Sequence, residues 1–191
     1  MLFLLSYAAP VSISAETFRL EKKPGVYLNE VGFGTGYAMG SLKGESRDLS
    51  VYPVFLRLAF NVNSLLGIES PGSTLQLICE PFVNGFSGPE DGVEVGCSIG
   101  IRYLHEVSGP VDLFLEAGAA PMYYSVHTVE QGKAGFSFLD QIGVGLQYRF
   151  GAKKALFGGY RWRHISHAGL ADRSNSGINT NAIIIGFSWL Y

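Results

Sequence analysis

Long apolar runs are missing from this sequence, and so are an excess of basic residues and any set of His, Cys, Asp and Glu with metal-ligand spacing. A helix that crosses a membrane needs about 18 or more predominantly apolar residues, so helical membrane proteins are excluded. The net charge of −2 offers no positive footprint, which argues against nucleic acid as a partner. No metal or other cofactor is predicted.

Cysteine is also scarce, because Cys79 and Cys97 are the only two and cannot form a disulfide scaffold. Both fall on the apolar face of their predicted strands, and both are equally distant from Gly88. A hairpin that is symmetric about Gly88 would place them directly opposite each other. A cross-strand disulfide and two free lipid-facing thiols both remain open.

What the sequence does contain is glycine, aromatic residues and apolar residues that recur at every second position. It has 25 Gly, 10 Tyr and 13 Phe, and 47% of its residues are hydrophobic. Alternation with a period of two predicts strands with one apolar face, as in a sheet that turns one side to lipid. The clearest case is 51–62, where the even positions are all apolar: Tyr52, Val54, Leu56, Leu58, Phe60 and Val62.

Eight such strands of 9 to 11 residues or more are predicted, joined by two alternating kinds of connection. Those at 63–72, 104–110 and 151–155 are short, and the first could hold a turn of helix. Those at 38–50, 83–91, 124–135 and 169–177 are polar. This alternation predicts an all-β fold, an eight-stranded antiparallel transmembrane β-barrel with one end in the periplasm and one outside the cell.

The polar faces of these strands predict the contents of the barrel interior. An eight-stranded barrel has room for side chains and no open pore, so a porin is disfavoured. A soluble lipocalin-like barrel is the structural alternative, but it would place its apolar face inside. The predicted interior residues, able to pair with one another, are Arg57, Glu80, Glu94, Arg102, Glu116, Arg149, Arg161 and Arg163.

The first 15 residues, MLFLLSYAAPVSISA, resemble the apolar core and cleavage site of an export signal, although no basic segment precedes them. The expected domains are therefore an export signal at 1–15 and the barrel at 16–191. Together with the terminal aromatic strand, this predicts a location in the outer membrane of a Gram-negative cell.

Three polar residues converge on the otherwise apolar face of the last hairpin, His164, Ser166 and Asn179. If the hairpin pairs about Ala171 and Asp172, His164 lies opposite Asn179, with Cβ atoms about 5 Å apart. Ser166 would be the nucleophile, His164 the base, and Asn179 would fix the imidazole tautomer. The alternative is that these polar groups meet lipid headgroups and water. His105 and His127 are expected to be solvated.

The stretch His164-Ile165-Ser166-His167-Ala168-Gly169-Leu170, followed by Asn175-Ser176-Gly177-Ile178-Asn179, resembles the signature of the PagL family of outer-membrane lipid A 3-O-deacylases. Weaker similarity runs from 53–61 to 136–143 and covers most of the chain. The resemblance implies an eight-stranded barrel with Ser166, His164 and the third residue outside, at the level of the outer leaflet. Lipid A, as lipopolysaccharide, would be the substrate and partner, within outer-membrane lipid.

Two substitutions separate this sequence from the family pattern. Asn179 stands where the family often has Glu, and Asp172 is a candidate for the missing carboxylate. His167 replaces the Asn that holds the oxyanion in the family, together with backbone N–H groups such as that of Gly169. These departures leave open a non-catalytic structural or adhesive barrel. A phospholipase-type esterase is also open, because it would use the same residues and differ only in substrate. Whether the protein forms a homodimer is also open.

Overall fold

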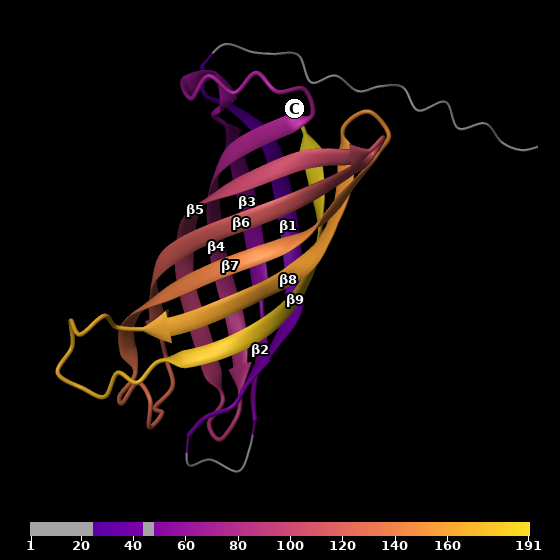
Figure 1. The fold of residues 1–191 in the computed structure, drawn as a ribbon. Helices are drawn as coiled ribbons and strands as arrows, with labels where there is room; N and C mark the ends of the chain where they lie inside the picture. Colours follow the sequence, from indigo (N-terminus) through magenta and orange to yellow (C-terminus); the bar gives the residue numbers. More distant parts are fainter. Residues whose placement is uncertain (1–24, 44–47) are drawn as a thin grey trace, which may run out of the picture.

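The protein is a closed antiparallel β-barrel, seen from the side in Figure 1. The computed structural model describes residues 25–43 and 48–191, so the predicted export signal lies outside the described residues. From β3 to β9 each strand pairs with the next one in the chain, and β1 pairs with β9 to close the ring of 8 strands. The strands are β1 (Tyr27–Gly40), β2 (Leu49–Tyr52), β3 (Val54–Asn61), β4 (Ser73–Ser87), β5 (Gly92–Ser108), β6 (Val111–Tyr124), β7 (Gly135–Phe150), β8 (Lys154–Ser166) and β9 (Ile178–Leu190).

Strands β2 and β3 follow one course that Pro53 interrupts, so nine labelled strands make a ring of 8. Both pair with β1 on one side and β4 on the other. Proline has no N–H to donate to the ladder, which breaks the strand there. The Pro53 carbonyl instead accepts a hydrogen bond from Thr35 Oγ1, at 2.8 Å.

Several strands extend further than predicted. The pairing of β4 with β5 runs from Ser73 opposite His105 to Phe86 opposite Gly92. Strand β4 continues to Ser87 and β5 to Ser108, so both enter the segments 83–91 and 104–110 that were expected to be connections. His105 is not simply solvated, because its Nδ1 lies 3.1 Å from Ser73 Oγ. The 3-10 turn at Asn63–Leu65 confirms a turn of helix in 63–72. No helix among the described residues is long and apolar enough to cross a membrane.

The two cysteines lie on the outward face as predicted, but not directly opposite each other. Cys79 pairs with Ile99 and Pro81 pairs with Cys97, because the hairpin is centred on Pro89 and not on Gly88. The thiols are therefore diagonal neighbours, free and half-buried, with their sulfur atoms 3.4 Å apart.

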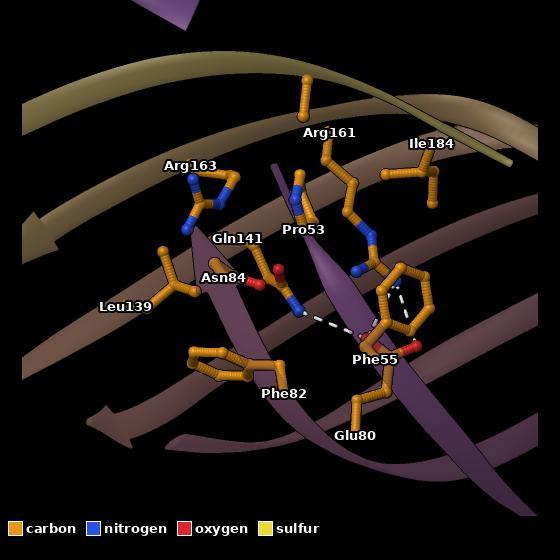
Figure 2. A pocket seen from close by; sticks show the side chains of 11 residues that line it. Pro53, Phe55, Glu80, Phe82, Asn84, Leu139, Gln141, Arg161, Arg163 and Ile184 are labelled. Atoms are coloured by element: carbon orange, nitrogen blue, oxygen red, sulfur yellow. Dashed lines mark hydrogen bonds and ion pairs between the residues drawn. The ribbon is translucent and has the colours of Figure 1, made fainter. Parts of the chain in front are cut away.

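Ion pairs fill the barrel interior, as the polar faces predicted. Arg57 donates to Glu80 at 2.6 Å and to Glu116 at 3.1 Å. Figure 2 shows Arg161 and Gln141 directed at the Glu80 carboxylate across a cavity of about 20 Å³, little more than one water molecule needs. The outward side chains are mostly apolar and exposed, which rules out the lipocalin-like arrangement.

Candidate active site

The candidate site lies at the loop end of the last hairpin, outside the barrel wall. Strand β8 carries His164 and Ser166 near its end, and β9 carries Asn179 near its beginning. The loop that joins them, 167–177, is the yellow and orange loop at the lower left of Figure 1. His164 pairs with Asn179, which confirms the predicted register about Ala171 and Asp172.

A hydrogen bond fixes the orientation of the His164 ring. Its Nδ1 lies 2.7 Å from Asn179 Oδ1. The amide oxygen can only accept, so Nδ1 carries the proton and Nε2 keeps a free lone pair. This is the tautomer that a histidine base requires.

Two further residues, Trp162 and Gly177, pack against the His164 ring. The indole of Trp162 stacks on it, with ring centroids 5.8 Å apart and an interplanar angle of 13°. On another side the loop backbone approaches so closely that a Cβ added to Gly177 would lie 2.5 Å from His164 Cε1. Gly177 also has φ +77, a backbone conformation that residues other than glycine rarely adopt. Any side chain at position 177 would therefore collide with the His164 ring, which explains why this position holds glycine.

We expect Gly177→Ala to lower kcat/KM for ester hydrolysis about 100-fold, because the new methyl group must displace the His164 ring from its hydrogen bond. Rates of the folded, detergent-solubilised variant measure the effect. Gly67→Ala is the matched control, since Gly67 also has a positive φ but open space around its Cβ position. A similar loss in both variants would show that backbone strain, and not displacement of His164, is responsible.

Ser166 lies two residues beyond His164 on the same outward face and is half-buried. Its strand partner on β7 is Phe138. Within the described chain no hydrogen bond joins Ser166 Oγ to His164. The Cα atoms of residues two apart in a strand are about 6.5 to 7 Å apart, so rotamer changes can bring the side chains together. Such bonds are often formed only when substrate is bound.

The segment after Ser166 is a tight turn with two positive φ angles. Leu170 N donates to His167 O at 2.9 Å, and Ala168 and Gly169 between them have φ 51 and φ 74. Ala168 is the one described non-glycine residue in this region of φ. Non-glycine residues with positive φ are strained and concentrate at functional sites.

The structure places His167 away from the outer face. Its side chain points inward and is 1% exposed. Nε2 donates to Ser174 O at 3.0 Å, and Nδ1 accepts from Ala171 N at 3.4 Å. Its backbone N–H donates to Asn175 Oδ1 at 2.9 Å. The His167 ring thus holds the loop 167–177 in shape and has both nitrogens occupied.

Two carboxylates lie near the site, Asp172, which the sequence suggested as a partner of His164, and Asp140, which it did not. Asp172 is exposed in the loop, and no interaction with His164 is found among the described residues. Asp140, on β7, points outward and is the strand partner of His164 on the side opposite Asn179. Sequence reasoning missed it, although the outward face of 136–150 offered a signal, since Asp140 alone is charged among Phe136, Phe138, Ile142, Val144, Leu146, Tyr148 and Phe150.

The described residues contain no group of three or more His, Cys, Asp and Glu side chains arranged to hold a metal ion. What the site does offer is a hydroxyl, an oriented imidazole and a tight turn directly after the hydroxyl, which suits nucleophilic attack on an ester.

Comparison with known protein families gives one matching family profile. The family profile described as "Lipid A 3-O-deacylase (PagL)" matches residues 56–188, which include His164, Ser166 and Asn179. No curated protein sequence matched the chain.

Comparison with solved structures identifies the same fold. The outer-membrane enzyme PagL superposes with a TM-score of 0.61 at 19% identity, over 82% of this chain and 97% of that one. Neisserial surface protein A also gives a TM-score of 0.61, at 14% identity, over 87% of this chain and 99% of that one. At these identities the likeness concerns the fold, an eight-stranded outer-membrane barrel.

Proposed function

The chain belongs to the PagL family of lipid A 3-O-deacylases, and from this membership and the geometry at His164 we propose that it hydrolyses the ester of the 3-O-linked hydroxyacyl chain of lipid A. The protein is an outer-membrane β-barrel. The observation that carries the proposal is the outward-facing pair of Ser166 and His164, with His164 Nδ1 held at 2.7 Å by Asn179. A half-buried imidazole that is held in this way on the outer face contributes nothing to the filling of the barrel interior.

In the proposed reaction, Ser166 Oγ attacks the ester carbonyl while His164 Nε2 takes the hydroxyl proton. His164 then returns the proton to the sugar oxygen as the bond between carbonyl carbon and sugar oxygen breaks. A water molecule, activated by the same nitrogen, releases the fatty acid from Ser166. No metal or other cofactor takes part.

The negative oxygen of the intermediate requires nearby hydrogen-bond donors. The N–H groups of Ala168 and Gly169 are our candidates, because they belong to the strained turn that begins just after Ser166. His167 would contribute by holding this loop through its bonds to Ser174 and Ala171, since its ring nitrogens are already engaged. Asp172 has no assigned part in this proposal.

Mass spectrometry of lipid A after incubation with the folded protein tests the proposal. We expect the mass to fall by one 3-hydroxyacyl group, with the free 3-hydroxy fatty acid appearing in the same sample. A fluorophosphonate, which reacts with activated serine, should label the protein on the peptide that contains Ser166. Labelling and release of fatty acid from phosphatidylglycerol vesicles, without any change in lipid A, would support the phospholipase alternative. Absence of both labelling and hydrolysis would support a non-catalytic barrel.

A further inference from the structure

His164 has a strand partner on each side, and the inference drawn from the second partner, Asp140, rests on the proposed function and deepens it. On β9 the partner is the neutral Asn179, and on β7 the partner is Asp140. Residues directly paired across antiparallel strands have Cβ atoms about 4.5 to 5.5 Å apart. His164 is therefore flanked on the outer surface by an amide on one side and by a carboxylate on the other.

The position of Asp140 is costly and calls for an explanation. It is exposed on the outward face, where the described strands carry no other acidic side chain. An acidic group turned toward lipid costs free energy, least near the membrane interface. Its other strand partner is Ala119 on β6, whose methyl group cannot pair with a carboxylate. None of the ion pairs among the described residues involves Asp140, so its negative charge is not neutralised by a neighbouring arginine or lysine.

The reaction creates a positive charge beside this carboxylate. When Ser166 gives its proton to His164 Nε2, the imidazole becomes an imidazolium. Asn179 can accept from Nδ1 but has no charge with which to stabilise that cation. The neighbouring ionisable side chains supply no negative charge to the imidazolium. Arg163 and His167 point inward, and Arg173 donates to the carbonyls of Lys133 and Phe136. The neutral Tyr160 hydroxyl donates to Asn181.

We infer that Asp140 stabilises the His164 imidazolium by its charge and so takes over the part that a carboxylate at position 179 would play. It acts through space on His164 and does not touch the ester, so it is a positioning residue and not a catalytic one. Opposite charges about 6 Å apart at a protein surface interact strongly enough to change a rate about 10- to 100-fold.

The inference is tested with Asp140→Asn, Asn179→Glu and the double variant, each compared with wild type in two assays. One assay is deacylation of lipid A, and the other is the rate of fluorophosphonate labelling of Ser166, which does not depend on the identity of the substrate. We expect Asp140→Asn to lower kcat and the labelling rate 10- to 100-fold with KM within about twofold of wild type. Asn179→Glu in the Asp140→Asn background should restore both rates, because it returns a carboxylate to the imidazole.

Restoration from the opposite strand separates a charge effect from a structural one, since a new side chain on β9 cannot repair a packing defect on β7. Asp140→Glu should keep most of the activity, and Asp91→Asn, in an exposed loop on the same end of the barrel, should leave both rates unchanged. Full activity of Asp140→Asn, a loss that Asn179→Glu fails to restore, or a change in KM alone would overturn the inference. If lipid A is not cleaved but labelling still depends on Asp140, the proposed substrate is wrong while the inference stands.

Discussion

Ser166→Ala is expected to lower kcat/KM for lipid A deacylation by at least about 10⁴-fold, because it removes the oxygen atom that forms the acyl-enzyme bond in the proposed reaction. Removing a serine nucleophile from a comparable site leaves only the rate that binding and the oxyanion donors provide. The side chain is half-buried on the outer surface and has no hydrogen bond within the described chain that the barrel would lose. The folded state should therefore be unaffected.

The measurement is the time course of fatty acid release by mass spectrometry, on protein whose folding is confirmed by the slower gel mobility it shows after heating. Ser108→Ala provides the matched control, since Ser108 ends β5 at the other end of the barrel. We expect Ser108→Ala to match wild type in both assays. Retention of more than a few per cent of the rate in Ser166→Ala would assign the nucleophile to another residue.

The largest expected effect on stability comes from the barrel interior. Glu116→Ala should lower the free energy of unfolding by about 3 to 5 kcal/mol, because it leaves buried cations without their partner. Its carboxylate lies 3.1 Å from Arg57 and 2.5 Å from Arg161, and Arg102 Nε lies 3.8 Å away. Without Glu116 these guanidinium groups face one another with only Glu30 and Glu80 between them.

Urea unfolding of the barrel in phospholipid vesicles, followed by tryptophan fluorescence, measures this loss. Glu106→Ala is the control, because Glu106 makes an ion pair of 2.9 Å with Arg149 while 40% of its side chain is exposed. Exposed pairs contribute about 1 kcal/mol or less. Equal effects of the two substitutions would mean that water enters the interior freely, in contradiction to the filled lumen.

The side of each strand that meets lipid can be predicted from the order of the residues. Because side chains alternate in a strand, the parity of residues such as Arg57 and Glu116 assigns them to the interior without any knowledge of the partners. The same parity places His164, Ser166 and Asn179 together outside. Their pairing followed as well, since His164 and Asn179 lie symmetrically about Ala171 and Asp172, where the hairpin does turn.

The register of the other strand pairs could not be predicted in this way and became known from the folded barrel. Moving the centre of a turn by one residue moves each strand partner by two, which keeps every side chain on its face and changes its neighbour. A hairpin centred on Gly88 predicts Cys97 opposite Cys79, whereas the observed centre at Pro89 places Ile99 there. The midpoint of Gly151-Ala152-Lys153-Lys154-Ala155 would pair His164 with Ile142. The turn is in fact centred on Ala152, and this shift of one residue places Asp140 directly opposite His164.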